Sequence, residues 1–430
     1  MITEYFLLIM ILSLPLQFAL NIGDGFDLVT TRVLVPLLFL FWLARGLARK
    51  KIEIPDKVEP WLVAVFLFLS ALSLFLGRDA SAGFRKLVYF LSIFPIFFVA
   101  ADVFQGKRWK EYGAQAVAAG GLLAAVVALF QFALPFFLGI GKVVKIWENM
   151  APVFLGQSFG KLVAGNSSWL VNVRGETIMR AFGFFPDPHN FAFFINLSFF
   201  TALGCFFVAK EKSQKIFLAI SAALALLASI LSFSRGGYLG LIAGGFFFAA
   251  VYLKRANLLG KAMLAVFIFI VGITVFNSQT VVKRLASSFN LREGSNAERI
   301  ENWNQAMDMV RDYPLSGVGL GNYARTIDPE SGTRSSIYAH NLFLDIAAET
   351  GILNAIVFFG LLLFSVWRGV KSGNMLGLGI AAGLAGFLIH SVFDTALYSP
   401  QALALLLVVI ALGLSPLNLK TKIENGKTTA

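Results

Sequence analysis

The residue best suited to acid–base chemistry is His340, in the segment Tyr338–Asn341. A neutral imidazole accepts a proton near pH 7, as a general base does when it activates a hydroxyl group. Asparagine often caps the start of a helix, so we expect Asn341 to begin a helix and to fix His340 at its entrance. Glu349 follows in the same expected helix as a secondary candidate. A histidine with only a structural role is the alternative at this stage.

Three arginines are candidates for binding an anion such as phosphate. Arg235 lies in the Ser-Arg-Gly-Gly turn 234–237, where glycines let backbone approach a phosphate and the guanidinium offers forked donors. Contact of Arg235 with lipid headgroups is the alternative. Arg180 precedes a proline-containing loop and Asn190, which we expect to cap a helix whose positive end attracts anions. Arg299 lies in the first turn of another expected helix, where a cation is unfavourable unless an anion binds nearby.

The other two histidines are weaker candidates. His189 is a competing base, but its position between Pro188 and the expected helix cap favours a structural role. His390 lies near Asp394, and we expect a hydrogen bond between these two side chains. The glycine-rich stretch 315–323 lacks the spacing of a dinucleotide fingerprint, so we expect it to shape the backbone rather than to bind a nucleotide.

The sequence predicts chemistry that uses no metal and no other cofactor. The acidic residues of the long polar segments show no metal-ligand spacing with a histidine. The single cysteine, Cys205, lies in an apolar run, which argues against a disulfide framework and against redox chemistry.

The elements around these residues are predicted to be membrane-spanning helices. Of the 430 residues, 57% are hydrophobic and 14% are charged, whereas soluble proteins contain about 25% charged residues. A helix that crosses a bilayer needs about 20 mostly apolar residues. The runs that approach this length predict an all-α polytopic membrane protein with about 12 transmembrane helices, forming a single domain over residues 1–430. The expected spans are Tyr5–Leu20, Leu28–Leu43, Trp61–Leu76, Phe84–Phe104, Ala114–Phe137, Phe191–Ala209, Ile216–Leu231, Tyr238–Leu253, Leu258–Phe276, Ile352–Trp367, Met375–Ser391 and Ala402–Leu414.

The distribution of charge predicts how the spans are oriented. Lys and Arg gather in the loops that follow the even-numbered spans, and positively charged short loops prefer the cytoplasm. We therefore expect both termini to be cytoplasmic and the long segments 138–190 and 277–351 to be extracytoplasmic. The net charge of +12 comes from these short clusters, so it does not indicate nucleic-acid binding.

The second long segment, between spans nine and ten, is expected to be partly helical. Residues 295–313 read as an amphipathic helix that ends before Pro314. Four apolar residues recur at helical spacing, which predicts that this face packs on the protein or the membrane surface. They are Ile300, Trp303, Met307 and Val310.

Three stretches of this sequence resemble the O-antigen ligase and polymerase superfamily of bacterial envelope glycosyltransferases. Residues 233–237 look like the family's Ser-Arg-Gly turn, and residues 312–322 look like its Pro-Leu-x-Gly-x-Gly segment. Residues 339–344, followed by Glu349 and Gly351, look like its histidine motif in the large loop. The layout of about twelve spans is also similar.

This resemblance implies transfer of a glycan from an undecaprenyl diphosphate carrier to an acceptor hydroxyl, at the outer face of the bacterial plasma (inner) membrane. His340 would be the catalytic base on a lipid or glycan acceptor. Arg180, Arg235 and Arg299 would hold the diphosphate of the donor, with Asn341, Glu349 and His189 as secondary candidates. Attack opposite the diphosphate would invert the anomeric carbon.

Three alternatives to the ligase reaction stay open on the sequence alone. A polymerase of carrier-linked repeat units belongs to the same superfamily, and so does a ligase that glycosylates protein. A transporter or flippase of lipid-linked glycans belongs to a different class. The spans carry few interior charges, which argues against a transport pathway through the bundle.

Overall fold

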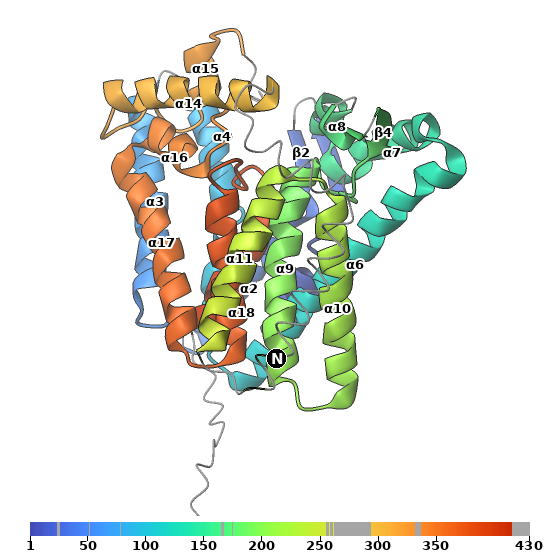
Figure 1. The fold of residues 1–430 in the computed structure, drawn as a ribbon. Coiled ribbons are helices and arrows are strands. Elements are labelled where there is room, and N and C mark those ends of the chain that lie inside the picture. Colours follow the sequence, from blue (N-terminus) through green and yellow to red (C-terminus); the bar gives the residue numbers. More distant parts are fainter. Residues whose placement is uncertain are drawn as a thin grey trace, which may run out of the picture.

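The computed structural model is a bundle of apolar helices with smaller elements gathered at one end (Figure 1). It describes residues 1–23, 26–50, 52–77, 79–164, 167–173, 175–254, 294–331 and 337–414, together with Leu258 and Lys261. The expected ninth span, Leu258–Phe276, and the expected loop residues 277–293 lie outside the described residues, apart from Leu258 and Lys261.

Most of the predicted spans correspond to helices in the described part of the chain. Eight stretches there are long and apolar enough to cross a membrane, and three shorter apolar helices accompany them. The long ones are α2 (Thr30–Ala48), α3 with the short helix η1 (Val58–Leu72 and Ser73–Leu76), α4 with α5 (Ala80–Leu91 and Pro95–Val103), α6 (Lys107–Leu138), α9 (Pro188–Val208), α10 (Lys212–Leu231), α11 (Arg235–Leu253) and α17 (Ile352–Lys371). The shorter ones are α1 (Ile2–Ser13), α18 (Met375–His390) and α19 (Pro400–Leu414).

The predicted first and second spans were wrong where they approach each other. Helix α1 ends at Ser13, and the chain then forms strand β1 (Ala19–Gly23), which pairs antiparallel with strand β2 (Phe26–Val29). Pro15 explains the early end, because a proline has no main-chain N–H with which to continue the helical hydrogen bonds. The apolar residues that follow Ser13 therefore form a hairpin rather than a longer span.

The core of the bundle is formed by α9, α18 and α19, whose side chains are buried along most of their length. Helix α18 packs against both α9 and α11, and α19 packs against α5 and α9. Helices that are apolar on every side, as these are, belong in the interior of a bundle. The turn between α18 and α19, residues 391–399, is thereby held at one end of this buried core.

The two long polar segments lie at the same end of the bundle (Figure 1). The first contains α7 (Ile140–Leu155), α8 (Gln157–Val163), the short helix η2 (Ser167–Trp169) and the antiparallel strands β3 (Leu170–Val173) and β4 (Glu176–Met179). The described part of the second contains α14 (Gly294–Asp312), α15 (Tyr323–Ile327) and α16 (Leu342–Thr350). The second segment is partly helical, as the sequence predicts.

Helix α14 forms where it was expected, and part of its expected apolar face, Trp303 and Val310, packs on the protein. Ala306 and Met309 are the buried residues of the helix, whereas Ile300 and Met307 are exposed. Helix α14 packs across α16, and the small side chain of Ala306 allows a close approach there. Trp303 does face the protein, with its ring 6.3 Å from that of Phe393.

Candidate active site

His340 stands at the entrance of helix α16, as predicted. The side chain of Asn341 accepts hydrogen bonds from the main-chain nitrogens of Phe343 and Leu344, at 3.1 and 3.2 Å, and so caps the helix. His340 itself has a φ of 53°, a left-handed conformation that is costly for a residue with a side chain. The main-chain nitrogen of Ala339 donates to Oδ1 of Asp345, 2.8 Å away. The backbone on both sides of His340 is therefore held by side chains of α16 and its cap.

A carboxylate that the sequence pattern did not single out as a site residue lies near two of the three histidines. Asp394, in the turn between α18 and α19, places Oδ1 3.5 Å from Nδ1 of His340. Its other oxygen, Oδ2, is 3.5 Å from Nδ1 of His189. The side chain of Asp394 is 7% exposed, whereas those of His340 and His189 are 26% and 21% exposed. Asp394 is thus a buried carboxylate shared by two partly accessible imidazoles.

This arrangement raises the pKa of His340. Burial by itself lowers the pKa of the imidazole, but the contact with Asp394 and its negative charge outweigh that effect. The charge of Arg299 lowers the pKa of His340 and the charge of Asp345 raises it, and both effects are weaker than that of Asp394. The pKa of Asp394 is held well below its usual range, because His189, His340 and Arg299 together outweigh the effect of burial. Asp394 is therefore ionised and can stabilise an imidazolium at His340.

The contact with Asp394 also sets which nitrogen of His340 can accept a proton. If Nδ1 carries its hydrogen toward Asp394, the lone pair lies on Nε2, at the opposite side of the ring. A separation of 3.5 Å is within ion-pair range but long for a hydrogen bond. Such contacts often tighten only when substrate is bound.

The contact expected between His390 and Asp394 is not formed. The ring of His390 instead stacks on Phe193, with 3.6 Å between centroids and 13° between planes. Among the described residues, neither ring nitrogen of His390 has a hydrogen-bond partner. The turn after α18 directs Asp394 toward His340 and His189, so the prediction for His390 was wrong.

His189 lies between Asp394 and the Ser-Arg-Gly-Gly turn. Its Nδ1 lies 3.0 Å from Oγ of Ser234, in addition to its contact with Asp394. Ser234 caps helix α11 by accepting a hydrogen bond from the main-chain nitrogen of Gly237, 3.2 Å away. Arg235 is the next residue in the chain and is 5% exposed. His189 therefore links the Ser-Arg-Gly-Gly turn to Asp394, and Asp394 also contacts His340 of the histidine motif.

The glycines of the Ser-Arg-Gly-Gly turn contact protein rather than an open phosphate site. A Cβ added at Gly236 would lie 2.5 Å from Cδ2 of His390, and one at Gly237 would lie 2.7 Å from Cβ of Ala192. No other residue type fits at such distances. The glycines seat the start of α11 against α18 and α9, which fixes the position of Arg235.

Arg180 is anchored close to the same centre. Its Nε donates to the carbonyl of Ser232 at 2.7 Å, and its Nη1 donates to the carbonyl of Ser168 at 2.8 Å. The residue is 2% exposed, and its charge acts on His189. These bonds tie the loop before α9 to the end of α10 and orient the guanidinium beside the histidine.

The cap of α9 differs from the prediction. The helix begins at Pro188, and Asp187 rather than Asn190 caps it, with Oδ1 2.8 Å from the main-chain nitrogens of His189 and Asn190. A proline suits the first helical position because its missing N–H would have no partner there. Burial, followed by the charge of Asp394, raises the pKa of Asp187. The protein's own carboxyl group thus occupies the helix end that was expected to attract an anion.

Arg299, on α14, is the second arginine whose charge acts on this centre. Its charge acts on both His340 and Asp394. Among the described residues, its buried Nε has no hydrogen-bond partner. The structure therefore brings Arg180, Arg299, His189 and His340 around Asp394, with Arg235 in the adjacent turn.

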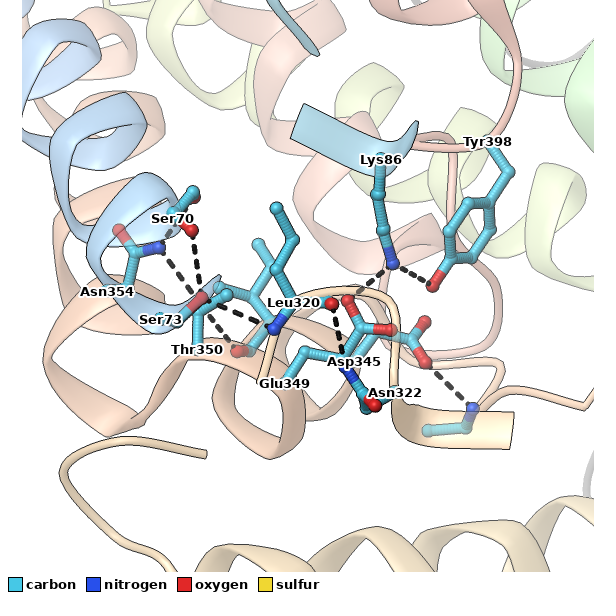
Figure 2. A network of polar contacts seen from close by, with 12 residues as sticks. Ser70, Ser73, Lys86, Leu320, Asn322, Asp345, Glu349, Thr350, Asn354 and Tyr398 are labelled. Atoms are coloured by element: carbon cyan, nitrogen blue, oxygen red, sulfur yellow. Dashed lines mark hydrogen bonds and ion pairs between the residues drawn. The ribbon is translucent and has the colours of Figure 1, made fainter. Parts of the chain in front are cut away.

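Glu349 lies in a second polar network rather than at His340 (Figure 2). Its Oε2 is 2.5 Å from Nζ of Lys86, on helix α4. The glycine-rich stretch 315–323 packs against this region, and a Cβ at Gly319 would lie 2.3 Å from Cα of Gly77. The φ of Gly319 is +94°, so this stretch shapes the backbone as predicted.

Sequence reasoning missed Asp394 and Lys86 as parts of this end of the molecule. Asp394 is an isolated acid in the turn between two predicted spans, and such a residue signals a buried pair. Lys86 lies inside a predicted span with no partner nearby in sequence. Only the fold brings either residue to the histidine motif. Within the described residues, no group of three or more His, Cys, Asp or Glu side chains is arranged to hold a metal ion.

The fold and the site together define a polytopic membrane protein with a buried imidazole–carboxylate centre flanked by arginines. The sequence model of a family described as O-Antigen ligase matches residues 220–359, the stretch that carries Arg235, Arg299 and His340. The chain is 22% identical over 342 residues to an O-antigen polymerase of Salmonella muenchen, covering 76% of this chain and 79% of the relative. It is 25% identical over 238 residues to a general O-oligosaccharyltransferase of Acinetobacter baylyi, covering 50% of this chain and 40% of that protein. These matches show that the chain is similar to members of the O-antigen ligase and polymerase superfamily.

Proposed function

We propose that this protein transfers a glycan from an undecaprenyl diphosphate carrier to an acceptor hydroxyl, as an O-antigen ligase does. The observation that carries the proposal is the contact of His340 with the ionised Asp394, with Arg299 acting on both groups and Arg180 acting on the neighbouring His189. A base and a set of cations are what a displacement at a sugar diphosphate requires. The site lies at the end of the bundle that we assign to the extracytoplasmic side of the plasma (inner) membrane, with both termini in the cytoplasm.

The reaction is a single displacement. Nε2 of His340 removes the proton of the acceptor hydroxyl while the hydroxyl oxygen attacks the anomeric carbon. The bond between that carbon and the diphosphate oxygen breaks, and the diphosphate leaves with the electron pair. Asp394 stabilises the imidazolium that forms, and Arg180, Arg235 and Arg299 stabilise the charge on the leaving diphosphate. Because attack and departure occur on opposite faces, the anomeric configuration inverts.

This division of labour assigns no metal and no cofactor to the reaction. The arginines supply the positive charge that a diphosphate needs, and their forked donors match its oxygens. The membrane places the isoprenoid part of the donor beside the apolar helices, so the diphosphate reaches the end of the bundle where these arginines lie.

Polymerisation of carrier-linked repeat units is the second candidate. The match to an O-antigen polymerase over 79% of its length favours it. The two reactions share donor and chemistry and differ in the acceptor, which is a lipid A core glycan for a ligase and a second carrier-linked glycan for a polymerase.

One reconstitution separates these functions from each other and from transport. The purified protein is placed in vesicles with undecaprenyl diphosphate glycan, either with lipid A core or with donor alone, and the products are sized. A single addition to lipid A core supports ligation, and a ladder from donor alone supports polymerisation. Movement of donor across the bilayer without any transfer would contradict both and support a flippase.

A further inference from the structure

The polar network around Lys86 connects the two chain segments that carry His340 and Asp394. Nζ of Lys86 lies 2.5 Å from Oε2 of Glu349 and donates to the hydroxyl of Tyr398, 3.1 Å away (Figure 2). The ammonium also lies 4.5 Å from the centre of the Tyr398 ring. Glu349 is in helix α16, which starts two residues after His340, and Tyr398 is in the turn that carries Asp394. One cation from the N-terminal half of the chain thus holds both segments.

Contacts lead from this cation back to the proposed base. The ring of Tyr398 lies 5.4 Å from that of Tyr338, and the ring of Tyr338 lies 4.0 Å from that of His340. The charge of Lys86 also acts on Asp345, whose Oδ1 holds the main-chain nitrogen of Ala339. Lys86 is therefore linked to His340 in two ways, through the ring contacts of Tyr398 and Tyr338 and through the backbone at Ala339, the residue before His340.

We propose that Lys86 is a positioning residue, which sets the distance between His340 and Asp394 by holding Glu349 and Tyr398 together. The inference rests on the proposed function for its catalytic meaning, although the geometry can be tested without it. His340 has a strained backbone and a contact of 3.5 Å with Asp394, so a small displacement would break this contact. Misplacing a reacting group by about 1 Å can lower a rate by about 10²-fold.

The pair of Lys86 with Glu349 is also a stability element, and the test must separate the two roles. Their side chains are 14% and 6% exposed, and removing one partner alone leaves an uncompensated buried charge. The double substitution Lys86→Met/Glu349→Gln removes both charges and keeps the side-chain volumes. The matched control is Glu59→Gln/Arg368→Met, since Glu59 and Arg368 form a buried pair with contacts of 2.5 and 2.8 Å. Glu349 precedes the start of α17, and Arg368 lies near the other end of that helix, about 24 Å along its axis from Ile352.

The readout that a purely structural role would not move is the pKa of His340. The 430-residue chain has three histidines, so nitrogen-15 labelled histidine gives a simple NMR titration in nanodiscs, assigned with His189→Gln and His390→Gln. The groups that act on His340 are Asp394, Arg299 and Asp345. If Lys86 holds Asp394 against His340, the Lys86→Met/Glu349→Gln variant lowers the pKa of His340, because burial remains while the contact loosens. The control variant leaves that pKa unchanged.

Glycan transfer in the same nanodiscs gives the second readout. The proposal predicts a loss of at least about tenfold in the transfer rate of the Lys86→Met/Glu349→Gln variant, with the control variant within twofold of wild type. An unchanged His340 pKa, or equal losses in the two variants, would overturn it. If wild-type protein transfers no glycan to any acceptor, the proposed function fails, and the NMR titration still decides whether Lys86 positions His340.

Discussion

Buried charged groups are paired differently at the two ends of the bundle. Away from the site, Arg368 donates two hydrogen bonds to the carboxylate of Glu59, one to each oxygen. At the site, Asp394 divides its two oxygens between His340 and His189, each 3.5 Å away. The Glu59–Arg368 pair is satisfied by these hydrogen bonds. Asp394 and the two histidines are held at ion-pair distance, and the buried Nε of Arg299 has no hydrogen-bond partner among the described residues. A buried polar atom that the fold leaves without a hydrogen-bond partner thus lies where a substrate would bind.

The largest loss of glycan transfer is expected when the proposed base, His340, is removed. His340→Ala is expected to insert normally and to lower the glycan transfer rate by about 10²- to 10⁴-fold, the usual contribution of a general base. Transfer is measured in nanodiscs with lipid-linked donor, and expression and melting temperature serve as folding controls. Wild-type activity in this variant would show that His340 is only structural.

Asp394 is the next test, because it distinguishes a shared carboxylate from an ordinary buried acid. Asp394→Asn keeps the shape of the side chain but removes the charge that stabilises the imidazolium. We expect the transfer rate to fall by about 10²-fold, with donor binding retained. A variant that loses stability but keeps its rate per folded molecule would place Asp394 with Glu59 as a structural group.

The dependence of activity on pH follows from the same contact. Only the neutral imidazole accepts a proton, and Asp394 raises the pKa of His340 above its ordinary value of about 6.5. The value of kcat/KM should therefore rise as pH increases through this raised pKa, and the rise should move to lower pH in Asp394→Asn. Identical pH profiles of kcat/KM in wild type and Asp394→Asn would show that Asp394 does not raise the pKa of His340.

Arg235 tests whether the site reads a diphosphate or merely attracts negative charge. Arg235→Lys keeps the charge but replaces a forked donor by a point charge. We expect kcat/KM for the donor to fall about tenfold, the equivalent of one lost charge-assisted hydrogen bond. Arg311→Lys, at an exposed residue of α14 paired with Asp308, is the control. Equal activity of wild type and Arg235→Lys would contradict the role in binding.

The smallest effect on transfer is predicted at the satisfied pair. Arg368→Met leaves the carboxylate of Glu59 buried without its partner, which costs about 3–5 kcal/mol of stability. The melting temperature should fall clearly, while the transfer rate per folded molecule stays within about twofold of wild type. A larger loss of rate would mean that this end of α17 is coupled to the site.

The sequence predicted the parts of the fold that depend on local pattern. Apolar runs located the helices, and Asn341 capped α16 as expected, because both signals lie within a few residues. The first span was drawn too long because hydropathy does not distinguish a helix from the hairpin that follows Pro15. The apolar face of α14 packs on the protein in part, since Trp303 and Val310 contact it whereas Ile300 and Met307 are exposed.

The candidate site was predicted in its residue types but not in its centre. His340, Arg180, Arg235 and Arg299 were identified because each lies in a distinctive turn or helix start. Asp394 was matched to His390, its neighbour in sequence, whereas the fold turns it toward His340 and His189. Lys86 could not be found in this way, because its partner Glu349 is 263 residues away in the chain.

The central claim is that His340 and Asp394 act as the base in a single displacement at a lipid-linked sugar, and its most direct test is the anomeric configuration of the product. Wild-type protein in nanodiscs is incubated with undecaprenyl diphosphate glycan of known configuration and an acceptor, and the new glycosidic bond is analysed by NMR. A base-assisted single displacement predicts inversion. Retention would exclude a single in-line displacement and would contradict the account.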